Sequence, residues 1–392
     1  MNPEHELLKE LTALPTAAGR EDAVVGFVRA WARRRRKRVR LDEDPAGNLV
    51  LQPAEESKGD EGAGRPLWLS AHMDHPAAVV EAVDPEDPRK IRARFLGGVG
   101  LAHMQDAKVQ LHRGGQRPAR GRVASAARPG PEHAAAPGER ADPELDVVFP
   151  RDPGAKPGQV LTWDLGGSVV RGTRLHAPAC DDLGSVAAAL ATLDRVTRRG
   201  RGGAGGAGVP LRVLLTRAEE VGFVGAIAAC RSGAVPADAR VLVLECSKAS
   251  PEAPIGGGVV VRVGDRSSTF DPGLTGAVAA AAGQLADETG LRWQRKLMAG
   301  GTCEATAYAA FGYEASCVCL PLGNYHNMAD DEEDALAREV ISLRDFDGMV
   351  ALLERLPAML GGDAPASGGG FRGRLEALHD GRASLLRPIG AG

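Results

Sequence analysis

The sequence predicts an α/β protein in which a mixed, mostly parallel sheet is flanked by helices and carries a small inserted β-barrel domain. Two patterns support this prediction. In the first and last parts of the chain, short apolar runs alternate with segments of helical periodicity, as in a sheet covered by helices. In the middle part, short apolar stretches alternate with Gly and Pro, and no long helical pattern is present.

The predicted domains follow these patterns. The chain has 392 residues, of which 43% are hydrophobic, so it is long enough for two or three domains with a sizeable core. We expect the first part of the α/β domain at residues 1–78, the barrel at 79–176, the second part of the α/β domain at 177–360, and a disordered tail at 361–392.

Composition favours a cytoplasmic protein that binds neither nucleic acid nor membrane. The net charge of -3 is small and the start of the chain is polar, with no secretory signal. No run approaches the roughly 18 apolar residues of a membrane span. The six cysteines form no CxxC pair and several lie in apolar runs, which indicates reduced, buried thiols.

Two helices and three strands are predicted before residue 79. The first helix begins at Pro3 and ends before Pro15, and the second follows the helical spacing of apolar residues from Val24 to Trp31. The basic run 33–38 is either a nucleic-acid patch or, as we expect, a solvated face, because cations are favoured at a helix C-terminus. The strands are expected near Val39–Leu41, Asn48–Gln52 and Leu67–Ser70.

The rest of the chain is predicted in the same way. Residues 113–143 are rich in Arg, Gly, Ala and Pro and are expected to form a long exposed loop, and 198–208 a Gly-rich linker. Ser342 and Asp345 have the N-cap and N3 spacing of a last helix. The expected strands are Ile91–Phe95, Val109–Leu111, Val147–Phe149, Val160–Trp163, Ser168–Val170, Leu211–Thr216, Val241–Leu244, Val259–Val263 and Ala315–Leu320. The expected helices are one after Asp181-Asp182, Val221–Cys230, Pro272–Thr289, Ala305–Phe311 and Leu343–Leu356.

Side chains of metal-ligand type follow the ends of several predicted strands. In open α/β sheets such groups gather beyond the carboxyl ends of the strands. Singly, each could be a solvated charge or a helix cap, but their joint occurrence at strand ends indicates a metal site. They are His72 and Asp74, Glu219 and Glu220, Glu245 and His326, together with Asp181-Asp182 at a helix start.

This set fits two divalent ions bridged by a carboxylate and a water. Zn²⁺ takes imidazole nitrogen and carboxylate oxygen, and Co²⁺ or Mn²⁺ are the alternatives. Asp74 would accept the other ring N–H of His72, and Glu219 would take the proton of the water. The predicted division gives His72 and Glu245 to one ion, Glu220 and His326 to the other, and Asp181 to both.

Several motifs are also those of a known family. They are Ala71-His72-Met73-Asp74, Asp181-Asp182, Glu219-Glu220-Val221-Gly222, Gly300-Gly301-Thr302 and Tyr325-His326, with Gly97-Gly98-Val99-Gly100 in the insertion. Over roughly residues 5–356 the sequence resembles the tetrahedral and glutamyl aminopeptidases, a family of dinuclear-metal exopeptidases. The resemblance implies a zinc-exopeptidase fold, an aminopeptidase of short peptides, a homo-oligomer, and a cis bond between Asp181 and Asp182.

The chain departs from the family pattern at four places. Leu183 stands where the family usually has Arg or Lys, Glu245 where it has Asp, Cys303-Glu304 where it has Asp-Ala, and His75 where it often has Glu. None removes a ligand or the base, but the substrate preference and the family's large cage remain open.

Three alternative functions remain at this point. A related carboxypeptidase or deacylase would use the same chemistry, although in those enzymes the extra domain comes later, after the third carboxylate region. A catalytically silent scaffold of the same fold is the second. A thiol nucleophile at Cys303 is the third, and no base partner accompanies it.

Overall fold

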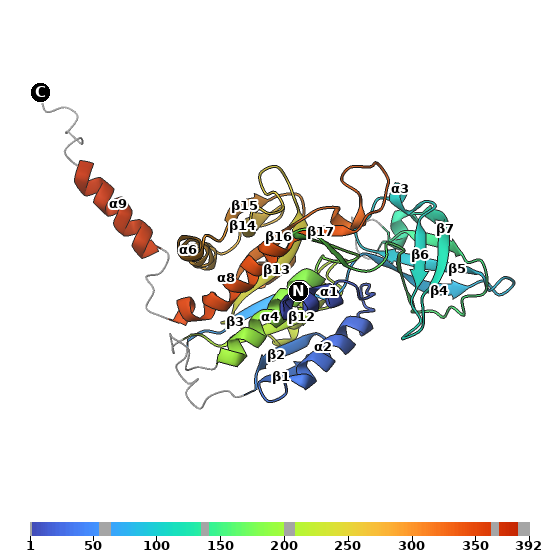
Figure 1. The fold of residues 1–392 in the computed structure, drawn as a ribbon, viewed down its shortest axis with the longest axis horizontal. Coiled ribbons are helices and arrows are strands. Elements are labelled where there is room, and N and C mark those ends of the chain that lie inside the picture. The colour runs from blue at the N-terminus through green and yellow to red at the C-terminus, as the bar shows by residue number, and fades with distance from the viewer. Residues whose placement is uncertain (1, 55–63, 135–140, 200–207, 362–367, 383–392) are drawn as a thin grey trace, which may run out of the picture.

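The computed structural model describes residues 2–54, 64–134, 141–199, 208–361 and 368–382. Its larger part is an α/β domain around an eight-stranded sheet, and a barrel stands beside it (Figure 1). The strands of the sheet are β1 (Val39–Glu43), β2 (Leu49–Pro53), β3 (Leu67–His72), β12 (Leu211–Thr216), β13 (Arg240–Lys248), β14 (Val259–Asp265), β15 (Trp293–Met298) and β16 (Glu314–Leu322). The predicted fold class is thereby confirmed.

The sheet has the strand order β1-β2-β12-β3-β13-β16-β14-β15. Its four central strands, β12, β3, β13 and β16, are all parallel to one another. The antiparallel pairs β1–β2, β2–β12 and β14–β16 lie on either side of these strands. Because the central strands are parallel, their carboxyl ends meet at one edge of the sheet.

Helices cover both faces of this sheet. On one face the buried side chains of five helices form the largest core cluster; these helices are α1 (Pro3–Leu11), α2 (Asp22–Arg34), α4 (Leu183–Arg199), α6 (Pro272–Thr289) and α8 (Leu343–Gly361). On the other face α5 (Val224–Ser232) and α7 (Glu304–Ala310) form a smaller cluster. Along β3, Leu67 and Leu69 belong to the first cluster and Trp68 to the second. The alternation of a strand therefore directs His72 to the side of α5 and α7.

The inserted segment closes into an antiparallel barrel with the order β4-β5-β8-β7-β6-β9. Phe95 stacks on Trp163 in its core, with ring centroids 5.3 Å apart. The strands are β4 (Ala77–Val83), β5 (Lys90–Leu96), β6 (Lys108–Leu111), β7 (Ala119–Ala127), β8 (Glu144–Val148) and β9 (Val160–Trp163), with short helices α3 (Leu101–Met104) and η1 (Pro131–His133).

A third, three-stranded sheet connects the end of the inserted segment to the α/β domain. It contains β10 (Val169–Arg171), β11 (Arg174–Ala177) and β17 (Glu339–Ser342) in antiparallel order. The strand expected at 168–170 thus belongs to this sheet and not to the barrel. β17 follows the last predicted ligand, His326, and its pairing with β11 brings it next to the chain that leads to Asp181.

Several local expectations are corrected. Residues 113–143 are not one exposed loop, because β7 pairs with both β6 and β8; of its side chains only Val123 is buried, so it lacks the apolar alternation of a strand. α5 begins at Val224 and not at Val221, since Phe223 has a positive φ of 59°. The tail expected to be disordered contains α9 (Gly368–Arg382), which stands away from the domain in Figure 1. The rest of that tail, like most of the linker at 198–208, lies outside the described residues.

Helix α8, the last helix of the α/β domain, is capped at its N-terminus nearly as predicted. The Asp345 N–H donates to the Ser342 hydroxyl over 3.3 Å. The Asp345 carboxylate accepts the N–H groups of Gly256 at 2.7 Å and Gly258 at 3.0 Å. Asp345 therefore anchors a loop before β14.

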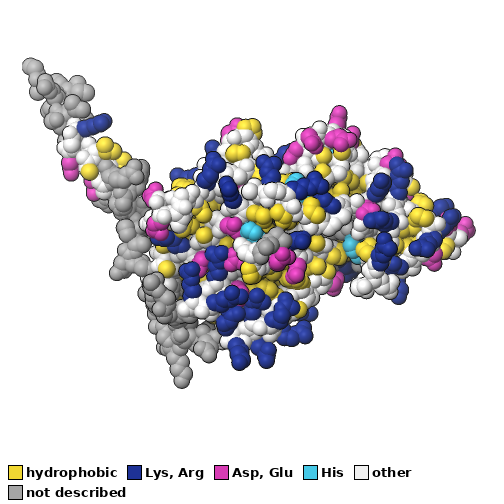
Figure 2. Space-filling view, viewed as in Figure 1, with side chains coloured by type: hydrophobic (Ala, Val, Ile, Leu, Met, Phe, Trp, Pro, Cys, Tyr) yellow, Lys and Arg dark blue, Asp and Glu magenta, His cyan; other side chains and the backbone are white. Residues whose placement is uncertain are grey.

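The basic run and the cysteines have the surroundings expected for them. Lys and Arg side chains gather over the lower edge of the α/β domain, where α2 and β1 lie (Figure 2). Arg35 and Arg38 lie 2.9 and 3.1 Å from Asp194, and the other cations of the run 33–38 are exposed. The six cysteines are unpaired, and all but Cys230 are buried. Among the described helices none is long and apolar enough to cross a membrane.

Candidate metal centre

The predicted ligands meet at the carboxyl edge of the central strands. His72 ends β3, Glu245 lies on β13, Glu219 and Glu220 follow β12, and Asp181 stands before α4. His326 lies in a short helix, η2 (Tyr325–Asn327), that follows β16. Potential ligand atoms lie within 4.8 Å of one another in three groups: His72, Asp181, Asp182 and Glu245; His72, Glu219 and Glu220; Asp181, Glu220 and His326.

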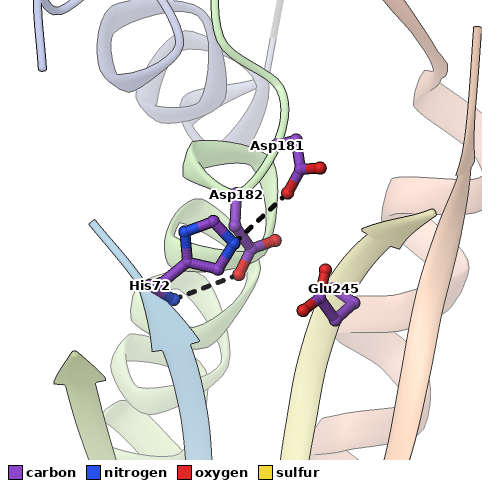
Figure 3. Close-up of side chains that lie close together, drawn as sticks. All are labelled: His72, Asp181, Asp182 and Glu245. Atoms are coloured by element: carbon purple, nitrogen blue, oxygen red, sulfur yellow. Dashed lines mark hydrogen bonds and ion pairs between the residues drawn. The ribbon is translucent and has the colours of Figure 1, made fainter. Parts of the chain in front are cut away.

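The Asp181 carboxylate lies between the two imidazoles. Its Oδ1 is 3.3 Å from Nε2 of His72, and its Oδ2 is 3.5 Å from Nε2 of His326. Figure 3 shows Asp181 and Asp182, which precede α4, facing His72 at the end of β3 and Glu245 on β13. One carboxylate oxygen therefore faces each histidine, as a bridging ligand requires.

The two adjacent glutamates face different partners. Oε1 of Glu220 lies 3.3 Å from Nε2 of His326, on the same side as Asp181. Oε2 of Glu219 lies 3.9 Å from Nε2 of His72. The loop after β12 thus places one carboxylate beside each histidine.

Asp74 has a wider set of contacts than the sequence suggested. Nδ1 of His72 lies 3.4 Å from the Asp74 carboxylate and 3.2 Å from the Asp74 backbone carbonyl. The carboxylate also accepts the N–H of Glu219 at 3.0 Å on Oδ1 and that of Glu220 at 3.1 Å on Oδ2. Asp74 is fully buried. Its two hydrogen bonds connect the end of the strand that carries His72 to the loop that carries both glutamates.

Asp182 is a member of the cluster that the predicted site did not include. Its Oδ2 accepts the backbone N–H of His72 over 3.2 Å, and the peptide bond between Asp181 and Asp182 is cis, as the resemblance implied. The sequence placed Asp182 with Asp181 at a helix start and in a family motif but gave it no ligand role, because a helix cap explains an acidic pair there equally well.

The cluster concentrates negative charge in a buried place. Burial raises the pKa of Glu219 well above its usual range, and it does the same for Glu245, with Asp181 and Asp182 adding to the effect. Burial would also raise the pKa of Asp181, but the imidazoles of His326 and His72 lower it below the usual range. In the described ranges no lysine or arginine forms an ion pair with these carboxylates.

The donor atoms fit divalent cations. Oδ1 of Asp181, Oδ1 of Asp182 and Oε1 of Glu220 are buried and accept no hydrogen bond from the described residues. Such orphaned oxygens are costly unless a cation or a water satisfies them. Imidazole and carboxylate are also the ligands that zinc and similar ions take. The residues present therefore suit ions that are each held by two to three carboxylates and one histidine.

The barrel and the third sheet also contact the centre. Nδ1 of His326 lies 2.8 Å from the carbonyl oxygen of Gly98, in the barrel motif singled out in the sequence. This contact assigns the proton to Nδ1 and leaves the Nε2 lone pair toward Glu220 and Asp181. Glu339, the first residue of β17, accepts backbone N–H groups next to the centre, and no sequence motif indicated it.

The residues left without a role are now placed. His75 contacts the backbone carbonyl of Asp181 through Nδ1 and Asn327 through Nε2. Cys303 is fully buried and its N–H donates to Asp265, and among the described residues no histidine forms a hydrogen bond with its thiol. Glu304 is also buried, and its Oε2 accepts the hydroxyl of Ser70 at 2.9 Å.

The fold and the site together indicate the class of protein to which this chain belongs. A mixed sheet with histidines and carboxylates at the carboxyl ends of its parallel strands, and a barrel inserted after the first histidine, is the arrangement of a metal-dependent exopeptidase. The chain belongs to the M42 glutamyl aminopeptidase family, whose model matches residues 47–339. The predicted resemblance is thereby confirmed, and membership supports a metal-dependent aminopeptidase.

Solved structures share the fold over almost the whole chain. The TET aminopeptidase of the marine sediment archaeon Thaumarchaeota archaeon SCGC AB-539-E09 has a TM-score of 0.72 at 18% identity, covering 93% of this chain and 99% of that one. An aminopeptidase from Desulfurococcus kamchatkensis has a TM-score of 0.68 at 21% identity, covering 90% and 94%. The TET1 peptidase of Pyrococcus horikoshii has a TM-score of 0.68 at 18% identity, covering 90% and 99%. No curated protein matches the sequence.

Proposed function

We propose that the protein is a dinuclear-metal aminopeptidase that removes N-terminal residues from short peptides. The observation that carries the proposal is the Asp181 carboxylate, with one oxygen facing His72 and the other facing His326. Family membership supports the aminopeptidase activity. The number of ions and the roles of single residues are our inference.

Each ion would have its own ligands and share one. His72 and Glu245 would hold the first ion, Glu220 and His326 the second, and Asp181 both. Zn²⁺ is the ion we propose, because imidazole with carboxylate is its usual set of ligands when sulfur is absent; Co²⁺ or Mn²⁺ would fit the same atoms. Asp182 lies in the same cluster as His72 and Glu245 and could help to hold the first ion, although its Oδ2 already accepts the His72 N–H.

The chain's own residues divide the remaining work. When bound, the two ions would lower the pKa of a water molecule and polarise the carbonyl of the peptide bond. Glu219, which is not assigned to an ion, would take the proton of the attacking water and pass it to the leaving amine. Its burial, which raises its pKa, favours a carboxylate that can accept a proton near neutral pH. Asp74 holds the N–H groups of Glu219 and Glu220 and so would orient the base.

The cellular setting is proposed by the same reasoning. The P. horikoshii TET1 peptidase can assemble into a tetrahedron or a large octahedral shell, and we propose a homo-oligomer for this chain as well. Unpaired, buried cysteines support a reducing compartment, and we propose a cytoplasmic location. The division into domains at 78, 176 and 360 remains a prediction.

Replacing Glu219 by Gln tests the base. The change keeps the size of the side chain and removes its ability to take a proton. We expect kcat to fall by about 10²–10⁴-fold while the metal content per chain, measured by elemental analysis, stays at that of the wild type. If Glu219→Gln keeps its kcat, Glu219 is not the base.

A substrate panel and metal removal test the reaction class. Peptides with a free amino terminus should be cleaved and the same peptides with an acetylated terminus should not, since an aminopeptidase binds the free amine. Cleavage of the acetylated peptides would favour a carboxypeptidase or deacylase. Dialysis against a chelator should abolish activity and Zn²⁺ should restore it; wild-type protein that purifies without any bound ion would favour a silent scaffold.

A further inference from the structure

One buried carboxylate outside the proposed ligands contacts both ligand segments. Glu339 is fully buried at the start of β17. Its Oε2 accepts the N–H of Cys180 at 2.6 Å and that of Asp181 at 2.9 Å. Its Oε1 accepts the N–H of His326 at 2.9 Å. The two oxygens of one side chain thus bind segments that lie 145 residues apart in the printed sequence.

All three partners of this carboxylate are donors. The two oxygens of a carboxyl group carry enough lone pairs to accept all three N–H groups at once. No lysine or arginine of the described residues forms an ion pair with Glu339, and its carboxyl group is held by these three backbone N–H groups.

The histidine segment needs such support. His326 has a φ of 55° and Asn327 a φ of 64°, so two successive residues with side chains lie in the left-handed region. This region is unfavourable for a residue with a side chain such as His. Such a conformation persists only where the surrounding structure holds the backbone. Here the Glu339 carboxyl group accepts a hydrogen bond from the N–H of His326 itself.

Other contacts hold the same two segments together from another side. His75 binds the Asp181 backbone carbonyl and Asn327 Oδ1, and Asn327 Nδ2 donates to the Pro178 carbonyl at 2.8 Å. Within the described part of the chain, the N–H groups of Asp181 and His326 have Glu339 as their hydrogen-bond partner. The carboxylate therefore sets the spacing between the bridging aspartate and the second histidine.

We propose that Glu339 is a positioning residue of the metal centre, which holds Asp181 and His326 at the separation that the second ion requires. The inference rests on the proposed metal centre and adds to it a residue that is not itself a ligand. Groups that orient metal ligands typically contribute about 10–100-fold to metal affinity. Glu339 would act on the ion between Asp181, Glu220 and His326 first.

Glu339→Gln is the sharpest test. The amide has the same size, but its nitrogen is a donor and would face at least one of the three N–H donors. We expect the affinity of the chelator-stripped protein for Zn²⁺, measured by competition with a chelating dye, to fall about 10–100-fold for the second ion. Glu339→Asp keeps the charge but is shorter by one methylene, so it should lose one of the two segments and about tenfold in affinity.

Asp345→Asn is the matched control. Asp345 is also a buried carboxylate that accepts backbone N–H groups, but those of Gly256 and Gly258, away from the centre. This variant should lose stability to denaturant while its Zn²⁺ affinity stays within twofold of the wild type. A purely structural role for Glu339 predicts the same behaviour for the Glu339 variants.

The outcomes separate this inference from the proposed function. If the wild type binds two ions and both folded Glu339 variants bind them within twofold as tightly, Glu339 does not position the ligands. If Glu339→Gln does not fold, Glu339→Asp decides by the same criterion. If the wild type binds no Zn²⁺ at all, the proposed metal centre is overturned and this role with it.

Discussion

Asp74→Asn tests how Glu219, the proposed base, is held in place. In the structure each oxygen of the Asp74 carboxylate accepts one backbone N–H, from Glu219 at 3.0 Å and from Glu220 at 3.1 Å. An asparagine offers one oxygen and one NH₂ group, so one of these N–H groups would face a donor. The loop after β12 would then lose one of its two anchors to β3.

The magnitude follows from these contacts. A hydrogen bond to a charged acceptor contributes about 1.5–3 kcal/mol, so we expect the free energy of unfolding to fall by about this amount. Displacement of a catalytic group by about 1 Å can cost about 10²-fold in rate, so kcat should fall by about that factor. The loop keeps other supports, since the N–H of Ala218 donates to Glu21 at 3.0 Å and that of Arg217 to Asn48 at 3.0 Å, and the variant should therefore fold.

The assay compares Asp74→Asn with Asp345→Asn. Each variant replaces a buried carboxylate whose two oxygens each accept one backbone N–H. Denaturant unfolding should show a similar loss of stability in both, while kcat on a short peptide should fall only in Asp74→Asn. Equal kcat values in the two variants would refute the role of Asp74 in holding the base.

Two further predictions concern the barrel. Burial lowers the pKa of His112 to about 4, below its ordinary value of 6.5, so the unfolded state binds a proton more readily. The stabilising contribution of neutral His112 is fully present above pH 6.5 and is lost as the pH falls toward 4. The free energy of unfolding should therefore drop less between pH 7 and 5 in His112→Gln than in the wild type. An equal drop in both proteins would contradict this prediction. Phe95→Ala should destabilise the protein by about 3–5 kcal/mol in denaturant, because Phe95 is 1% exposed and stacks on Trp163; a loss below about 1 kcal/mol would mean that the barrel core can collapse around the gap.

The site was predictable where its residues follow a regular strand. His72, Glu245 and the pair Glu219-Glu220 stand at or just after apolar runs, and the rule that parallel strands end at one edge brings them together. His326 lies four residues after β16 ends, and its place in the cluster depends on a loop with positive φ values that no periodicity indicates. Glu339 had no signal, since its role depends on β17 pairing with β11.

The strands of the fold also differ in how well the sequence predicts them. Fully buried central strands such as β3 begin with a run of large apolar residues, here Leu67-Trp68-Leu69, so the sequence reveals them. Strands with few buried side chains were missed: β7 buries Val123 alone, and β15 has no buried residue at all. For such strands the partner decides the conformation, because their hydrogen bonds to a neighbouring strand, and not their own apolar pattern, hold them.

The sequence by itself determined the α/β class, the inserted barrel and the set of ligand-type residues, because burial and strand ends leave a local pattern of residue types. Only the tertiary structure decided which carboxylate oxygen of Asp181 faces which histidine. It also decided that Asp74 binds the backbone of Glu219, and that Glu339 binds the backbone of both Asp181 and His326. These are contacts between backbone groups and side chains far apart in the chain. A backbone N–H is the same in every residue but proline, so its partner cannot be recognised before the chain is folded.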